Sequence, residues 1–186
     1  MAIRKPGVTH AISDTGPLIS VFQSDSLDLV TTLLPVIHIP QVCVDELVRH
    51  GYRGALQSAG GRIEIHVLEE VEEEIAQAIA RRIALHPMSN DPVPDNHLGE
   101  AQAMALFTRS EFTNDVLLLD ELAAREVAEE MALPLTGFAG VLLAAVQEGF
   151  LTADELKERL ETCQRQGTHY SKAFIEQIYL AAKRRG

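Results

Sequence analysis

Tryptophan is absent from the 186-residue sequence, and aromatic residues make up only 5% of it. Its two cysteines, Cys43 and Cys163, lie far apart and form no CxxC pair, so we expect both to be reduced. No run approaches the roughly 20 apolar residues of a membrane-spanning helix, and the N-terminus lacks the apolar core of a signal peptide. These absences lead us to expect a cytoplasmic protein without membrane partners.

Positive charge is scarce as well. The sequence has 16 Lys and Arg residues and 27 Asp and Glu residues, which gives a formal net charge of −11. Such a balance works against binding to nucleic-acid backbones, because that affinity rests largely on Lys and Arg. Part of the acidity comes from the run at 69–74, which suits a solvated helix face. The rest is compatible with a carboxylate cluster that holds a divalent cation.

Several catalytic signatures are also missing. The sequence has no glycine-rich phosphate loop and no GxSxG nucleophile elbow. His97 and Glu100 have i,i+3 spacing, but no HExxH pattern accompanies them, and the seven histidines are scattered, so we assign no metal role to the histidines. Asp14-Thr15-Gly16 matches the aspartic-protease triplet, yet that class is all-β and needs two triplets or a dimer. The helical patterning of this chain excludes it.

The remaining composition is that of a folded domain, with 46% hydrophobic and 23% charged residues. Periodicity predicts strands over 8–13, 36–39, 63–67, 116–119 and 134–135. It predicts helices over 18–22, 26–34, 40–51, 69–86, 98–110, 121–131 and 137–147, a loop over 87–96, and two more helices after Thr152 and Ser171. This alternation is typical of an α/β fold with a mainly parallel sheet. We expect one domain over 1–150 and a helical pair over 151–186 packed on it.

Four carboxylates stand at the ends of these elements. Asp14 follows the first strand, and Asp120 follows a strand without a polar residue. Glu46 lies in the second turn of a helix, and Glu100 lies at the start of the helix after the proline-rich loop. In an open α/β sheet such ends meet at one edge, where ligand sites form. The four would repel one another unless a hard cation such as Mg²⁺ or Mn²⁺ joined them.

Each carboxylate also has a simpler role open to it. Asp14 suits a turn before Thr-Gly-Pro, and Asp120 suits the N-cap of the following helix. Glu100 suits a helix dipole, and Glu46 suits a solvated helix face, where Asp45 beside it is an equal choice. No single position is decisive, and the coincidence of the four favours the metal site.

Short motifs follow one another along most of the chain in an ordered series. They are Ser13-Asp14-Thr15-Gly16-Pro17-Leu18-Ile19, Ile39-Pro40 with Glu46-Leu47, Leu98-Gly99-Glu100-Ala101 with Ala103, Leu119-Asp120-Glu121 with Arg125 and Ala128, Gly140-Val141-Leu142-Leu143-Ala144, Gly149-Phe150-Leu151 and Tyr170-Ser171. In this series the sequence resembles the PIN-domain proteins, a metal-dependent nuclease fold that includes the ribonuclease toxins of toxin–antitoxin pairs. It is most similar to the branch of predicted nucleic-acid-binding PIN proteins.

The resemblance implies a three-layer α/β/α fold with a central parallel sheet, and hydrolysis of RNA by a water that Mg²⁺ or Mn²⁺ activates. It implies that four residues are both catalytic and metal-binding: Asp14, Glu46, Glu100 and Asp120. Thr15 is expected to hydrogen-bond to Asp14 or to the water, and Glu121 to assist from behind the metal ligands. Arg125 is a further supporting residue, although an intrahelical pair with Glu121 is its default role.

Two positions depart from the usual pattern of the branch. Gly16 stands where Ser is usual, and Phe138 stands where Thr is usual, with Thr136 close enough to take a capping role. The acidic charge also means that an RNA track would have to be gathered from individual arginines. The available ones are Arg49, Arg53, Arg81, Arg82, Arg109 and Arg125.

Two functions follow from these patterns. The first is a Mg²⁺- or Mn²⁺-dependent endoribonuclease acting on single-stranded or structured RNA, as a toxin with an antitoxin partner. The second is a PIN-fold binding or regulatory protein with weak catalysis that acts through protein partners. Its candidate surface is the C-terminal helical pair, with apolar Leu156, Leu160, Phe174, Ile175, Ile178 and Leu180. A homodimer is compatible with either function.

Overall fold

The computed structural model describes residues 10–112 and 115–184. Within these residues one sheet has the strand order β3-β2-β1-β4-β5, and every pairing is parallel. The strands are β1 (His10–Ser13), β2 (Val36–Pro40), β3 (Ile63–His66), β4 (Val116–Leu118) and β5 (Leu135–Thr136). Val8 and Thr9, at the start of the first predicted strand, lie outside the described residues. The predicted parallel sheet is confirmed.

The strand order reverses at the centre of the sheet. From β1 the chain moves to β2 and β3 on one side, and it then returns to β4 and β5 on the other side. The ladder continues beyond the strand ends, because the amide of Asp14 donates to the carbonyl of Leu118 at 3.2 Å. Ligand sites of open α/β sheets form where the order reverses in this way. Asp14 and Asp120 follow the two strands that border this point.

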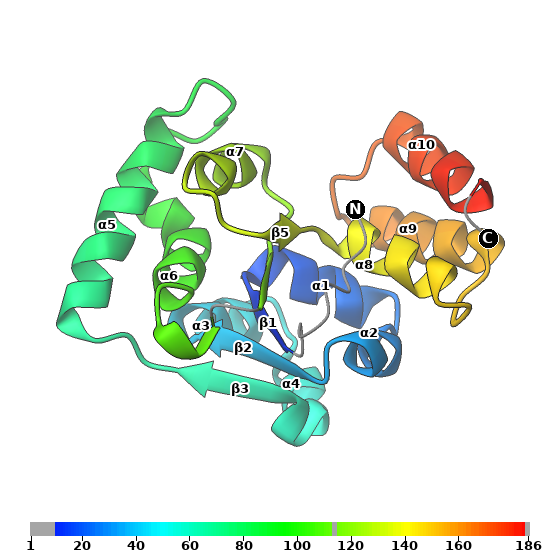
Figure 1. The fold of residues 1–186 in the computed structure, drawn as a ribbon, viewed down its shortest axis with the longest axis horizontal. Coiled ribbons are helices and arrows are strands. Elements are labelled where there is room, and N and C mark those ends of the chain that lie inside the picture. The colour runs from blue at the N-terminus through cyan, green and yellow to red at the C-terminus, as the bar shows by residue number, and fades with distance from the viewer. Residues whose placement is uncertain (1–9, 113–114, 185–186) are drawn as a thin grey trace.

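Helices cover both faces of the sheet, as predicted for a three-layer α/β/α fold (Figure 1). They are α1 (Thr15–Gln23), α2 (Leu27–Leu33), α3 (Gln41–Arg49), α4 (Arg53–Ala59), α5 (Glu70–Leu85), α6 (Leu98–Leu106), α7 (Leu122–Glu130), α8 (Phe138–Gln147), α9 (Ala153–Arg165) and α10 (Lys172–Lys183). Short 3₁₀ turns are η1 (Gly60–Arg62), η2 (Pro94–His97) and η3 (Ser110–Phe112). The turn η2 begins inside the predicted loop over 87–96 and ends one residue after it.

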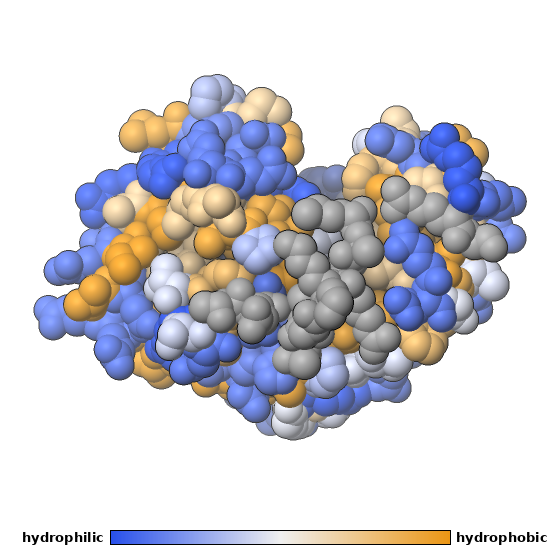
Figure 2. Space-filling model, viewed as in Figure 1, coloured by the Kyte–Doolittle hydropathy of each residue, from blue (hydrophilic) through white to orange (hydrophobic). Residues whose placement is uncertain are grey.

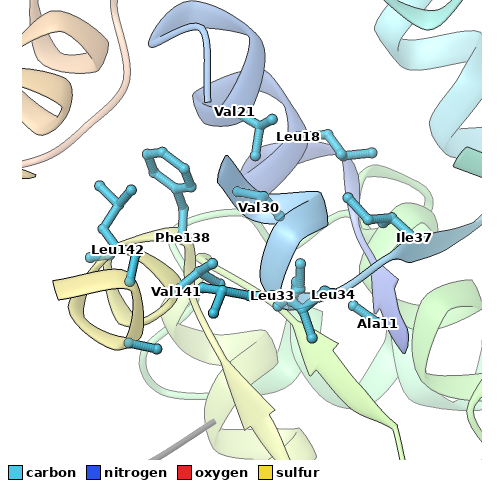
Figure 3. Packing of buried hydrophobic residues seen from close by; sticks show 14 of the residues in the cluster. Ala11, Leu18, Val21, Val30, Leu33, Leu34, Ile37, Phe138, Val141 and Leu142 are labelled. Carbon is cyan, nitrogen blue, oxygen red and sulfur yellow. The ribbon is translucent and has the colours of Figure 1, made fainter. Parts of the chain in front are cut away.

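Successive side chains of each short strand point to opposite faces of the sheet, which gives two apolar cores. One contains Ala11 and Leu118 and is covered by α1, α2, α3, α8 and α9. Figure 3 shows its packing around Ala11, Leu18, Val21, Val30, Leu33, Leu34, Ile37, Phe138, Val141 and Leu142. The other contains Ile12 and Leu117 and is covered by α5, α6 and α7. The sheet is therefore buried on both faces, which fixes the positions of its strand ends.

The structure differs from the predicted elements in several places, and the clearest differences concern α6, α3 and α4. The helix predicted over 98–110 ends at Leu106, where the hydroxyl of Thr108 donates to the carbonyl of Ala105 at 2.7 Å and competes with the helical pattern. Pro40 was predicted as the first residue of a helix, but it is the last residue of β2 and the N-cap of α3, which begins at Gln41. Helix α4 was not predicted, because only Ala59 is buried in it and its sequence carries no apolar stripe.

The C-terminal helices share the first core. Leu156, Leu160 and Ile175 are buried in the cluster that includes α1 and α8, whereas Leu180 is 49% exposed. Most of the apolar surface proposed for partner binding is thus internal, because α9 and α10 pack on each other and on α8. The division into 1–150 and 151–186 stays a prediction.

Some large apolar side chains are exposed on the outer surface. Ile65, Val67 and Val71 are more than half exposed between the edge strand β3 and the start of α5, where Figure 2 shows apolar atoms gathered. The outline of the molecule is indented between α7 and α10 (Figures 1 and 2). None of the described helices has the length and apolarity that a membrane crossing requires. The cytoplasmic location stays a prediction.

Candidate metal and active site

Asp14 is the N-cap of α1 and is only 5% exposed. Its Oδ2 accepts a hydrogen bond from the amide of Gly16 at 3.3 Å, and its Oδ1 lies 3.9 Å from Sγ of Cys43. Asp14 therefore fills the predicted turn role, and its other oxygen faces α3. A carboxylate held by a helix N-terminus is fixed in direction, because the backbone amides there favour negative charge.

Glu46, on α3, contacts the first turn of α1 beside Asp14. Its Oε2 accepts from the hydroxyl of Thr15 at 2.5 Å, and its Oε1 lies 3.8 Å from Nη2 of Arg49. The predicted partner of Thr15 was Asp14 or a water, and the structure gives Glu46 instead because α3 faces the first turn of α1. Asp45 is exposed and accepts from Gln41 at 3.0 Å. The structure thus distinguishes two neighbouring carboxylates that the sequence left equal.

Gly99 brings the start of α6 against these two carboxylates. A Cβ atom at this position would lie 2.8 Å from Oδ1 of Asp14 and 3.5 Å from Oε2 of Glu46. Any side chain would therefore displace the carboxylate of Asp14. The sequence motif included this glycine, but its role in permitting the close approach was not predicted.

Glu100 follows in the first turn of α6. Burial raises its pKa well above the usual range, and the negative charges of Asp14, Glu121 and Glu46 raise the pKa further. The structure therefore brings Glu100 into the same electrostatic cluster as Asp14 and Glu46.

Asp120 lies after β4 and is held by two donors from distant parts of the chain. Its Oδ1 accepts from the amide of Phe138 at 3.0 Å, and its Oδ2 accepts from the hydroxyl of Tyr170 at 2.9 Å. Asp120 does not cap α7, because Glu121 takes that position and accepts from the amide of Ala124 at 2.6 Å. The simpler N-cap role considered for Asp120 is therefore wrong.

Phe138, which stands where threonine is usual in the resembling branch, still contacts Asp120 through its backbone at the start of α8. The backbone amide of Phe138 binds Asp120, while its side chain is 1% exposed in the first core. Gly137 allows the approach, since a Cβ there would lie 2.3 Å from Oδ1 of Asp120. Thr136 does not take the predicted capping role at this helix start, where Asp120 is the acceptor, and its hydroxyl donates to the carbonyl of Gly137 at 3.4 Å.

Arg125 lies beside Asp120. Its Nη1 donates to the carbonyl of Leu119 at 2.7 Å, a different contact from the predicted pair with Glu121. Its positive charge lowers the pKa of Asp120, although burial dominates and the net pKa of that carboxyl is raised. Arg125 therefore binds the backbone just after β4 and supplies positive charge next to the carboxylate cluster.

The electrostatics of the cluster favour a bound cation. Burial raises the pKa of Asp14 to about 7, with further raising by the charges of Glu46 and Asp120 and opposition from the amides of Thr15 and Gly16. The negative charges of these carboxylates repel one another, and oxygen donors of this kind suit Mg²⁺ or Mn²⁺. In the described part of the chain, these oxygens do not form a triad within 4.8 Å of one another.

Two further residues of the site were not predicted to act there. Cys43 is buried against Asp14, and burial together with the charge of Asp14 raises the pKa of its thiol well above the usual range. Tyr170 reaches Asp120 from the segment between α9 and α10. The motif containing Tyr170 was recognised, but no sequence spacing connects it to a strand end.

Comparison with known families gives one match. A family model described as a PIN domain matches residues 10–184, which include all described elements. A search of curated proteins gave no match.

Proposed function

Because the chain belongs to the PIN-domain family, a nuclease fold, we propose that it is a Mg²⁺- or Mn²⁺-dependent endoribonuclease. The observation that carries the proposal is the burial of Asp14 beside Glu46, with electrostatic repulsion from Asp120, in a cluster of carboxylates at the strand-order reversal. The proposed ligands are Asp14, Glu46, Glu100 and Asp120. Their oxygen donors fit the proposed metal.

The chain's own residues would orient this site before substrate binds. The amide of Gly16 fixes Asp14, the hydroxyl of Thr15 fixes Glu46, and the amide of Phe138 fixes Asp120. A bound Mg²⁺ or Mn²⁺ would supply a water of lowered pKa and a positive charge beside the phosphoryl oxygen. Fixed ligands of this kind lower the reorganisation needed during reaction.

RNA contacts are proposed for the arginines nearest the cluster. Arg49 is next to Glu46, with a side chain that is 71% exposed, so it is available to a phosphate group. Arg82 and Arg109 have glutamate partners, Glu130 at 2.8 Å and Glu72 at 2.7 Å. The ion pair of Arg49 with Glu46 is longer, at 3.8 Å, and the side chain of Arg49 is the most exposed of the three, so we assign the proposed RNA contact to Arg49.

The test is cleavage of single-stranded RNA with Mn²⁺ or Mg²⁺, compared between wild type, Asp14→Asn and Asp45→Asn. Asparagine keeps an N-cap acceptor at position 14, so the fold should persist. Asp45→Asn removes the same charge from an exposed position on α3. We expect wild type and Asp45→Asn to cleave, and Asp14→Asn or added chelator to abolish cleavage. Cleavage by folded Asp14→Asn at the wild-type rate would contradict the proposal.

A toxin role is a finer part of the proposal. It requires that expression of wild type arrest growth, that Asp14→Asn not do so, and that a co-expressed neighbouring small protein restore growth. A wild-type protein that binds no metal and cleaves no RNA would instead favour the partner-binding alternative. The RNA substrate, the antitoxin and the homodimer all belong to these proposals.

A further inference from the structure

Three histidines form a chain across the sheet face covered by α5 and α6. His10, His38 and His66 come from β1, β2 and β3, which are neighbours in the sheet. Nδ1 of His10 lies 3.1 Å from Nε2 of His38, and Nδ1 of His38 lies 2.9 Å from Nε2 of His66. Phe112 packs on this chain, with its ring centroid 4.8 Å from that of His38. The register of the strands thus gathers side chains that are scattered in the sequence.

Carboxylates flank the histidine chain on both sides. In the described part of the protein, ligand atoms of His10, His38 and Asp115 lie within 4.8 Å of one another, and those of His38, Glu64 and His66 do so as well. Either set has the donors of a transition-metal site, because imidazole nitrogens suit Zn²⁺ and carboxylates supply negative charge.

The charges around the two sets differ. Nη1 of Arg109 lies 3.3 Å from Nδ1 of His66, so a cation bound at His66 would be repelled. Glu64 has a side chain that is 54% exposed. By contrast, Asp115 is 5% exposed and His38 is 4% exposed, and Asp115 interacts with His10. The set on the side of Asp115 is therefore the better cation site.

We propose that His10, His38 and Asp115 form a second metal site, which takes Zn²⁺ rather than Mg²⁺. Two nitrogens each about 2.0–2.1 Å from a tetrahedral zinc lie roughly 3.3 Å apart, close to the separation of the His10 and His38 nitrogens. A water or an incoming group completes the coordination.

Glu64 has a supporting position in this site. Its Oε2 lies 3.4 Å from Nδ1 of His38, the ring nitrogen opposite the proposed ligand atom. The nearer neighbour of Nδ1 is Nε2 of His66 at 2.9 Å, so in the metal-bound form the proton on Nδ1 lies between these two partners and Nε2 of His38 is free to bind the metal.

The second site is distinct from the carboxylate cluster. His10 begins β1 and Asp14 follows its end, while Asp115 precedes β4 and Asp120 follows it. Four residues of strand span about 13 Å, so the two sites lie at opposite ends of the same strands. Zinc there would join β1, β2 and the residue before β4 without using the proposed nuclease ligands. The inference therefore does not depend on the proposed function.

The test is titration of metal-free protein with Co²⁺, followed by absorption spectroscopy, and with Zn²⁺, followed by thermal unfolding. We expect one equivalent of Co²⁺ to give the intense visible bands of a low-coordinate nitrogen-containing site, and Zn²⁺ to raise Tm. His38→Gln, His10→Gln and Asp115→Asn should lose both signals. His50→Gln, which removes an exposed histidine elsewhere, and Asp14→Asn should keep them.

The outcomes separate the two sites. No Co²⁺ bands in wild type, or bands retained by all three ligand variants, would overturn the zinc site and leave a hydrogen-bonded imidazole chain. Loss of the bands in Asp14→Asn would also overturn it, because the metal would then lie in the carboxylate cluster. Circular dichroism checks the fold of each variant. If buried His38→Gln unfolds, the near-isosteric Asp115→Asn and the half-buried His10→Gln decide the result.

Discussion

The hydroxyl of Tyr170 donates a hydrogen bond to Oδ2 of Asp120 at 2.9 Å, which joins the C-terminal segment to the end of β4. The same hydroxyl oxygen lies 3.0 Å from Oγ of Ser20 on α1. Burial and the charge of Asp120 raise the pKa of Tyr170 far above its usual range, so the phenol stays a donor. The segment between α9 and α10 thus carries a residue that orients a proposed metal ligand.

Tyr170→Phe should weaken metal binding at the carboxylate cluster while the protein stays folded. The variant removes one of two donors to Asp120, and a hydrogen bond to a charged group contributes about 1.5–3 kcal/mol. We expect a lower Mn²⁺ affinity by calorimetry and a reduced Tm. Tyr179→Phe is the matched control, because its hydroxyl donates to exposed Asp154 at 2.7 Å. Equal Mn²⁺ affinities for both variants would show that Tyr170 is only structural.

Gly99→Ala should impair the site more than it changes stability. The new methyl group would lie 2.8 Å from Oδ1 of Asp14 and displace that carboxylate, whereas alanine favours the helix by up to about 1 kcal/mol. We expect loss of Mn²⁺ affinity and of any RNA cleavage with a small change in Tm. Gly54→Ala on α4 is the control, since its methyl group would meet open space. Unchanged metal affinity in Gly99→Ala would mean that Asp14 moves without consequence.

Without divalent metal, the stability contribution of Asp14 should fall as pH rises. Its folded pKa is about 7 and its ordinary value is 3.8, so between these values the folded state binds more protons than the unfolded state. The favourable contribution is complete below pH 3.8 and is lost as pH rises to about 7, by on the order of a few kcal/mol. Thermal unfolding in chelator from pH 4 to 8 measures this loss.

Asp14→Asn isolates that contribution from opposing groups. Burial lowers the pKa of His38 to about 4, so its contribution to stability is lost as pH falls and has the opposite sign. The difference in Tm between wild type and Asp14→Asn cancels the effect of His38. We expect the Tm of the variant to rise relative to that of wild type as pH rises. Added Mn²⁺ should make wild type the more stable of the two at pH 8. A difference independent of pH would contradict the raised pKa.

Local sequence signals were enough to predict the sheet and the positions of two of the four carboxylates. Asp14 and Asp120 follow apolar runs that read as strands, so their meeting at one edge required only the parallel fold. The choice of Glu46 over Asp45 depends on the rotation of α3, which sequence spacing does not define to one residue. The strand pairing and the family match confirm the fold. The catalytic roles of the four carboxylates stay predictions.

Contacts between distant segments could not be predicted. Tyr170 and Asp120 are 50 residues apart, and no periodicity relates them. The histidines were judged scattered because they are far apart in the sequence. The strand register places His38 opposite Ile12, and Ile12 shares one face of β1 with His10, so the two histidines lie on the same face of the sheet. Glycine roles were missed for a similar reason, because Gly99 and Gly137 matter only through what a Cβ atom would touch.

Phe138→Thr should separate stability from metal binding. The threonine usual in the resembling branch keeps the backbone amide that donates to Asp120, but it replaces a side chain that is 1% exposed in the first core. Loss of most of a buried phenylalanine costs about 3 kcal/mol or more, so Tm should fall by several degrees. Mn²⁺ affinity at a temperature where the variant is folded should match wild type. Phe150→Thr, at a residue that is 50% exposed, should change neither quantity much. A Phe138→Thr variant that kept its Tm but lost Mn²⁺ would mean that the side chain, rather than the amide, positions Asp120.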